Sequence, residues 1–163
     1  MYYGSGVYTA GTDIISENNI ESNSMGIWLS GPYNRIIRNN IVNNGVGVSD
    51  FIGENYVQHN NFINNSATAG VTENSFTISI WDDSYPSGGN YWSNYNGTDN
   101  NEDGIGDTPY IINENNQDKY PFMNPVDIST IPEFPSWTLL PIVFVSTLIA
   151  IIFRNKSRKK WLK

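Results

Sequence analysis

The sequence predicts an all-β fold: a right-handed parallel β-helix of about four 21-residue coils, followed by a C-terminal cap with a calcium-type loop and one C-terminal transmembrane helix. Three observations support this prediction. An asparagine-rich motif recurs every 21 residues, apolar residues keep the same interval, and a long uncharged segment near the C-terminus ends in a basic cluster. Repeats of about this length are typical of solenoids, in which each repeat forms one structural unit.

The repeat is clearest in the segments Asn18-Asn19-Ile20, Asn39-Asn40-Ile41 and Asn60-Asn61-Phe62. Val7 matches Ile27 if one residue is deleted, so we expect the first coil to be incomplete. The other columns that keep the interval are Asp13/Asn34/Asn55, Asn23/Asn44/Asn65, Ile15/Ile36/Val57/Ile78 and Ile27/Val48/Ala69.

Each repeat consists of short apolar segments separated by asparagine and glycine, which fit three strands and three turns better than helices. Stacked coils place each strand about 4.8 Å from its copy in parallel register, so that the apolar columns fill the interior. Asparagine suits the turns because it tolerates left-handed backbone, and Asn18, Asn39 and Asn60 are expected to form a hydrogen-bonded ladder. The alternative solenoid is a leucine-rich repeat, but Leu29 is the only leucine in the repeats.

The coils are expected to occupy residues 1–81, with 72–81 as a last strand, and the cap 82–127. Tyr91, Trp92 and Tyr95 are expected to cover the open end of the coils, because an uncovered end is an unpaired sheet edge. The remaining chain is divided into a linker at 128–136, a transmembrane helix at 137–153 and a basic cytoplasmic tail at 154–163.

Residues 137–153 carry no charged side chain and would span roughly 25 Å as a helix, close to the thickness of a bilayer core. The basic residues that follow predict a cytoplasmic C-terminus and an extracellular body. A buried core helix is the alternative. Because the N-terminal segment lacks the pattern of a signal peptide, we expect the chain to be part of a longer protein or to have a misplaced start.

Composition excludes several classes of function. All sixteen acidic residues precede the apolar segment, where the basic residues are only Arg35, Arg38 and Lys119, so the acidic body argues against nucleic-acid binding. The chain has no cysteine, which excludes disulfides and thiolate chemistry.

An aspartate-rich loop covers residues 99–107. Gly104 permits a sharp turn, and Tyr110 stands where an EF-hand has its bidentate glutamate, so the loop is closer to the short calcium loops of extracellular modules. A polar turn without an ion is the alternative. The predicted calcium ligands are Asp99, Asn101, Asp103, the Ile105 carbonyl and Asp107.

Residues 80–125 contain the blocks GGNYWSNY and DGIGDTPY and, with the repeats, resemble NosD-like β-helix proteins of archaeal type, also described as carbohydrate-binding and sugar-hydrolase-type domains. The resemblance covers roughly residues 7–125. The segment Pro132-Glu133-Phe134-Pro135 is similar to PEF-type sorting tags, which implies recognition by a membrane sorting enzyme. A plain transmembrane anchor is the alternative.

The NosD resemblance implies copper delivery to nitrous-oxide reductase. Copper sites use histidine, cysteine or methionine ligands, whereas this body has one histidine, His59, and three methionines widely separated in sequence. We therefore expect calcium and not copper.

No catalytic residue is assigned, but Glu17, Arg38 and His59 stack in successive coils and are the candidates for a polysaccharide lyase or hydrolase. A surface ladder of charges explains the same column. Asp50 and Glu54 lie in a neighbouring turn. Aromatic residues that could stack on sugars are Trp28, Tyr33 and Tyr56, and glycosylation sequons begin at Asn64 and Asn96.

The sequence thus predicts a membrane-anchored cell-surface β-helix with a structural or adhesive role, in which carbohydrate is the ligand. The alternatives are a polysaccharide lyase or hydrolase and a NosD-like copper-maturation accessory protein. The expected partners are the membrane, cell-surface glycans or surface-layer components, and a membrane sorting enzyme.

Overall fold

The computed structural model describes residues 4–50, 52–71 and 78–128, which belong to a compact unit ending at Ile128. The regular structure of these residues is entirely β. No helix in this part of the chain is long and apolar enough to cross a membrane, and the predicted span at 137–153 lies outside the described residues, as does the tail.

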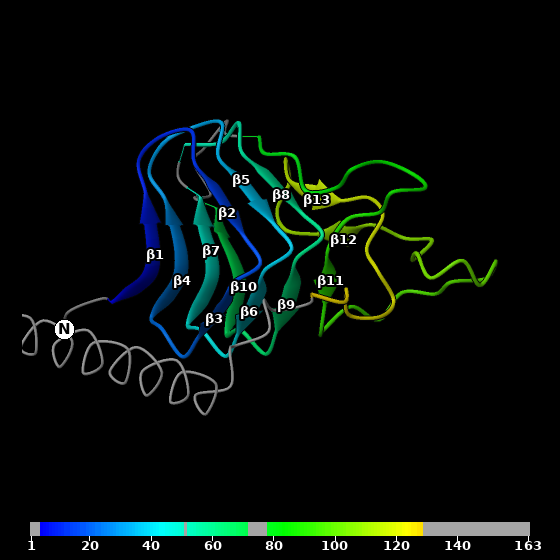
Figure 1. The fold of residues 1–163 in the computed structure, drawn as a ribbon. Helices are drawn as coiled ribbons and strands as arrows, with labels where there is room; N and C mark the ends of the chain where they lie inside the picture. Colours follow the sequence, from blue (N-terminus) through cyan, green and yellow to red (C-terminus); the bar gives the residue numbers. More distant parts are fainter. Residues whose placement is uncertain (1–3, 51, 72–77, 129–163) are drawn as a thin grey trace, which may run out of the picture. The chain divides into compact units, whose positions relative to one another are not determined.

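Three parallel sheets form the walls of a β-helix (Figure 1). Each coil contributes one strand to each sheet, which confirms the prediction of three strands per repeat. The first sheet contains β1 (Ser5–Thr9), β4 (Met25–Leu29), β7 (Val46–Asp50) and β10 (Ala67–Val71). The second contains β2 (Ile14–Ser16), β5 (Arg35–Ile37) and β8 (Tyr56–Gln58). The third contains β3 (Asn19–Glu21), β6 (Asn40–Val42), β9 (Asn61–Ile63) and β11 (Tyr91–Trp92).

The solenoid has about three turns, β2–β4, β5–β7 and β8–β10, rather than the four that the sequence predicts. β1 pairs with β4 at the N-terminal end of the solenoid. Val7 opposes Ile27, as the alignment of the first coil with one residue fewer predicts. At the other end the regular repeat is lost. Residues 72–77 lie outside the described part, and Ile80 makes an isolated bridge with Tyr56 in place of the predicted last strand.

Apolar columns fill the interior. Ile15, Ile36 and Val57 pair in register in the second sheet, and all three are buried. The prediction that Ile78 is the fourth buried residue of this column is wrong, because Ile78 is 59% exposed. The bridge between Tyr56 and Ile80 instead places the buried Trp81 beside Val57, so the insertion after β10 shifts the register by three residues.

Asparagine ladders stabilise the corners between the sheets, and the predicted ladder of Asn18, Asn39 and Asn60 is one of them. The Asn39 side chain is fully buried, and its oxygen accepts hydrogen bonds from the backbone and side-chain nitrogens of Asn18. Its amide nitrogen donates to the carbonyls of Ile15 and Ile37 and to the side-chain oxygen of Asn60. The same pattern repeats along Asn23, Asn44 and Asn65 and along Asp13, Asn34 and Asn55.

The residue before each corner asparagine turns the chain through left-handed backbone. Arg38, with φ of 55°, precedes Asn39, and Asn43, with φ of 53°, precedes Asn44. This conformation costs a non-glycine residue roughly 1–2 kcal/mol. Hydrogen bonds from the buried asparagine that follows offset this cost.

The cap closes the last coil with aromatic side chains. Trp92 is buried and stacks between Phe62 and Tyr110, with ring centroids 4.3 Å apart in each pair. Tyr95 packs against the same core, while Tyr91 is partly exposed. Beyond Trp92, the short antiparallel pair β12 (Tyr110–Ile111) and β13 (Gln117–Asp118) completes the cap.

A buried carboxylate ends the longest asparagine ladder. Asn90 follows Asn60 in the ladder and accepts its hydrogen bonds, and the Asn90 backbone N–H in turn donates to Asp118 at 2.7 Å. The same carboxylate accepts hydrogen bonds from Trp92 Nε1 and from the Tyr120 backbone. Burial raises the pKa of Asp118 to about 6, against the opposing effect of these three donors.

The ladder predicts a large loss in the free energy of unfolding when one of its side-chain amides is removed. Asn39→Ala removes the oxygen that accepts from Asn18 and the amide that donates to the Ile15 and Ile37 carbonyls and to the Asn60 side chain. At about 1–3 kcal/mol for each group left unsatisfied, we expect the free energy of unfolding to fall by at least about 3 kcal/mol. Asn19→Ala, at an exposed position in the same repeat, should change stability by less than about 0.5 kcal/mol. Urea unfolding of the two full-length variants measures the difference, and equal midpoints would contradict the ladder.

Asp118 predicts a stability that falls as the pH rises. Between about pH 4 and pH 6 the folded state keeps a proton that the unfolded state has released, so this contribution is complete below pH 4 and is lost above pH 6. The shift corresponds to about 3 kcal/mol. Urea unfolding of the wild type and of Asp118→Asn at pH 4 and pH 7 isolates this residue. The difference in stability between the two proteins should change by about that amount, and a difference that is the same at both pH values would contradict the assignment.

Candidate ligand-binding face

The outer face of the second sheet carries large side chains. Because side chains alternate along a strand, the residues beside the buried column Ile15, Ile36 and Val57 point outward. On the N-terminal side of that column, Ile14 pairs with Arg35 and Arg35 with Tyr56, and Tyr56 bridges to Ile80. The 21-residue repeat therefore builds an outward row as regular as the inward one.

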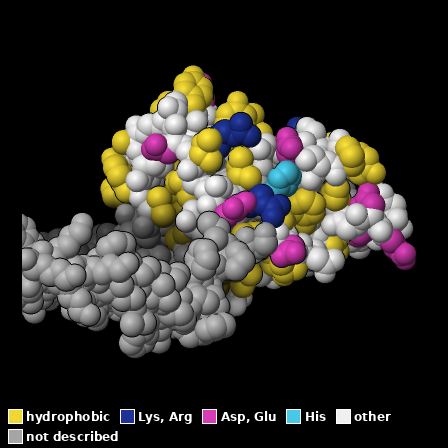
Figure 2. Space-filling model, in the orientation of Figure 1, with side chains coloured by type: hydrophobic (Ala, Val, Ile, Leu, Met, Phe, Trp, Pro, Cys, Tyr) yellow, Lys and Arg dark blue, Asp and Glu magenta, His cyan; other side chains and the backbone are white. Residues whose placement is uncertain are grey.

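Exposed apolar and aromatic residues concentrate on this face. Ile14 is 70% exposed, and the members that we call the tyrosine–isoleucine face are Ile14, Tyr33, Tyr56, Ile78 and Ile80. Tyr33 and Ile78 belong to the adjoining corner, where the Tyr33 N–H donates to the Glu54 carbonyl and the Glu54 N–H to the Ile78 carbonyl. Hydrophobic and basic side chains gather over β5 and β8 in Figure 2. A contiguous exposed apolar patch on a soluble body is typical of a binding surface.

The two tyrosines lie close to each other and to one carboxylate. A hydrogen bond to Glu54 and the charge of that residue are the main causes that raise the pKa of Tyr33, with burial and the nearby Tyr56 adding to the effect. The Tyr33 phenol therefore keeps its proton at physiological pH. Exposed aromatic rings of this kind can stack on a flat apolar ligand surface while their hydroxyls exchange hydrogen bonds.

A cavity of about 380 Å³ adjoins the face at the cap end. Ile78 and Ile80 contribute apolar wall, and the polar wall includes Asp82, Ser84, Gln117 and Lys119. The Asp82 carboxylate accepts hydrogen bonds from the backbone N–H groups of Ser84 and Lys119, which fixes this side of the cavity. Apolar walls with a few placed polar groups are typical of small-ligand sites.

The structure separates the predicted sugar-stacking residues. Tyr33 and Tyr56 share the face, but Trp28 lies in β4 of the first sheet and packs edge-on against Tyr8, with ring centroids 5.5 Å apart. Sequence reasoning missed Ile14, Arg35 and Ile80, although the first two follow the repeat one residue before the buried column. Nothing in the repeat indicates Lys119 or Asp82, because the cap brings them to the face from outside the coils.

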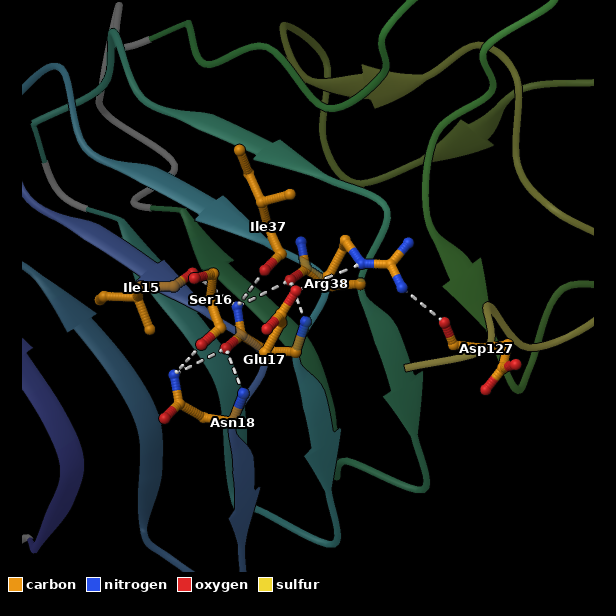
Figure 3. Close-up of polar contacts among 9 residues, drawn as sticks. Ile15, Ser16, Glu17, Asn18, Ile37, Arg38 and Asp127 are labelled. Atoms are coloured by element: carbon orange, nitrogen blue, oxygen red, sulfur yellow. Dashed lines mark hydrogen bonds and ion pairs between the residues drawn. The ribbon is translucent and has the colours of Figure 1, made fainter. Parts of the chain in front are cut away.

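The candidate catalytic column is brought together only in part. Glu17, Arg38 and His59 occupy successive copies of one corner, each in left-handed backbone. Arg38 Nε lies 3.9 Å from Glu17 Oε1, and its Nη2 donates to the Asp127 carbonyl at 2.7 Å (Figure 3). His59 instead faces the cap, where Nε2 lies 3.1 Å from the Ser87 carbonyl and its ring 5.8 Å from Phe122. Arg38 and His59 therefore connect the corner of the coils to residues of the cap.

The aspartate-rich loop is closed by its own N–H groups. The Asp99 carboxylate accepts from Asp103 and Gly104, the Asp103 carboxylate from Ile105 and the Asn101 amide, and one Asp107 oxygen from Asn100. Gly104 has φ of 86°, as the predicted sharp turn requires. In the described part of the chain, no group of three or more histidine or acidic side chains is placed to hold a metal ion.

Asn64 and Asn96, the first residues of the two sequons, are both exposed. Asn64 lies at the corner after β9, and Asn96 lies between Tyr95 and the aspartate-rich loop. Their glycosylation stays a prediction.

Comparison with known proteins decides the family. Residues 1–97, more than half of the chain, match the protein family described as NosD, periplasmic copper-binding protein. The chain belongs to the NosD family. Comparisons with curated proteins and with solved structures found no match. The NosD resemblance and the parallel β-helix are therefore confirmed, and the periplasmic description agrees with a body outside the cytoplasm.

The family description contradicts the predicted cofactor. The sequence argument favoured calcium and made copper unlikely, whereas the NosD family is described as copper-binding. That argument was wrong because it inferred the metal from the count of copper-type ligands. Within the described ranges, the copper-type side chains come from separate elements of the fold. Met25 lies in β4, His59 follows β8, and Met123 lies in the cap, and no metal-binding group is found within these ranges.

Proposed function

We propose that this NosD-family chain is an extracytoplasmic β-helix scaffold that binds carbohydrate on the tyrosine–isoleucine face. The observation that carries the proposal is the pairing of exposed Tyr33 and Tyr56 with a cavity whose wall mixes apolar and polar side chains. Sugar rings present one apolar face and a rim of hydroxyls, so they match aromatic rings beside hydrogen-bonding groups. The rigid ladders behind the sheet hold this surface in a fixed shape.

Attachment to the cell surface is part of the same proposal. The uncharged segment 137–153 anchors the chain in the membrane, the basic tail 154–163 lies in the cytoplasm, and the body faces outward. In this arrangement the face meets cell-surface glycans or surface-layer components. The PEF-like segment Pro132–Pro135 makes a membrane sorting enzyme a further partner.

A glycan array probed with the full-length chain tests the proposal. Tyr33→Ala combined with Tyr56→Ala should reduce binding by about tenfold or more, because stacking and apolar contact are lost together. Tyr8→Ala is the matched control, since Tyr8 is about as exposed as Tyr33 but lies in β1 of the first sheet. Equal losses in the two proteins, or no glycan bound by the wild type, would contradict the proposal, and turnover of a bound glycan would favour the polysaccharide lyase or hydrolase.

The family description supports a second proposal, a NosD-like accessory role in copper maturation. A titration of the full-length chain with Cu(I) and Cu(II) tests it, with an unrelated extracellular domain as the control. Binding of one copper ion per chain in competition with a chelator is the expected result. Copper bound no more tightly than by the control would contradict this role.

A further inference from the structure

We propose that the carbohydrate on the tyrosine–isoleucine face is an anionic polysaccharide, whose carboxylates bind Arg35 and Lys119. This inference rests on the proposed function and adds the class of ligand. It begins from the distribution of positive charge over the body rather than from the tyrosines.

The body has few basic side chains, and two of them are on this face. Among the described residues the cations are Arg35, Arg38 and Lys119. Arg38 is engaged by the Asp127 carbonyl and lies near Glu17. Arg35 and Lys119 are both exposed, and within the described ranges neither side chain has a hydrogen bond or an ion pair. Two cations without an internal partner in an otherwise acidic body are available to an external anion.

The sheet fixes the spacing between Arg35 and Ile80, at the edge of the cavity that Lys119 lines. Arg35 in β5 opposes Tyr56 in β8, and Tyr56 bridges to Ile80, so the backbones of Arg35 and Ile80 are separated by two strand spacings, about 10 Å. Ile80 and Lys119 both line the cavity. Tyr56 thus lies between Arg35 and Ile80 in the sheet, and Ile80 shares the cavity with Lys119. A polymer that carries a carboxylate on successive sugars can contact both cations and the ring at once, which raises its overall affinity.

The chemistry of the two side chains favours carboxylates. The planar guanidinium of Arg35 can donate two parallel hydrogen bonds to one carboxylate, and the Lys119 ammonium acts as a point charge beside the cavity. Both are exposed, so an incoming carboxylate does not first have to displace an internal partner.

Acidic residues near the face do not cancel this preference. Asp82 accepts hydrogen bonds from two backbone N–H groups, and Glu54 interacts with Tyr33. The remaining acidic groups repel an anion over longer distances, but physiological salt screens charges beyond about 8 Å. Direct contacts at Arg35 and Lys119 are screened much less.

The test compares ligands that differ only in charge. Oligomers of galacturonate and of alginate, each with its methyl ester, are titrated calorimetrically against the full-length chain. The acids should bind about tenfold more tightly than the esters, and added NaCl should weaken the acids alone. Arg35→Gln and Lys119→Gln should each reduce the affinity for the acid by about five- to tenfold and leave the ester unchanged. Thermal unfolding verifies that these exposed substitutions leave the fold intact.

Arg38→Gln is the matched control, because it removes the same charge from a side chain that already has internal partners. It should leave the affinity for the acid nearly unchanged. An ester that binds as tightly as its acid overturns the inference, and so does an equal loss in Arg35→Gln and Arg38→Gln. Ester binding that still depends on Tyr56 retains the proposed function while the inference fails, whereas the absence of binding by every acid, ester and array glycan overturns both.

Discussion

The asparagine ladders are the constraint on which the rest of the structure depends. The corners before Asn39 and Asn60 turn through left-handed backbone at Arg38 and His59, which is unfavourable for residues with a side chain. The asparagine that follows is buried and bonds both to its own coil and to the next, as Asn39 and Asn60 do. A corner of this kind is stable only when another coil lies against it, so the turns and the stacking of coils require each other.

The ladders also decide where function can reside. Interior positions and corners are occupied by residues that the stack requires, which leaves the outward rows free to vary without loss of the fold. The second sheet uses this freedom to expose Ile14, Arg35 and Tyr56 in one row. At its end the cap adds Lys119 and Asp82, and the boundary between repetitive and non-repetitive structure becomes a cavity.

The description of the family concerns metal binding, whereas the polar side chains described in this chain have structural contacts. NosD proteins are described as copper-binding, and among the described residues of this chain no group of three or more histidine or acidic side chains is placed to hold a metal ion. Its polar side chains are used in structure: Asp118 ends a ladder, Asp50 bonds to Gly53 and Ser79, and Asp99 closes a loop on Gly104. In this chain the described carboxylates thus stabilise turns and coil ends, whatever else the family does.

The sequence alone determined the period, the three strands per coil, the buried columns and the ladders, because each depends on contacts between residues 21 positions apart that repeat along the chain. It also indicated Tyr33 and Tyr56 as candidates for stacking on sugars and Trp92 as a residue that covers the end of the coils. Only the tertiary structure decided that Trp81 replaces Ile78 beside Val57, that Asp118 terminates a ladder, and that Lys119 lines a cavity with Ile80. These contacts occur once, between the insertion, the cap and the last coil. No period encodes such contacts, because they are set by how non-repeating segments pack against the end of the stack.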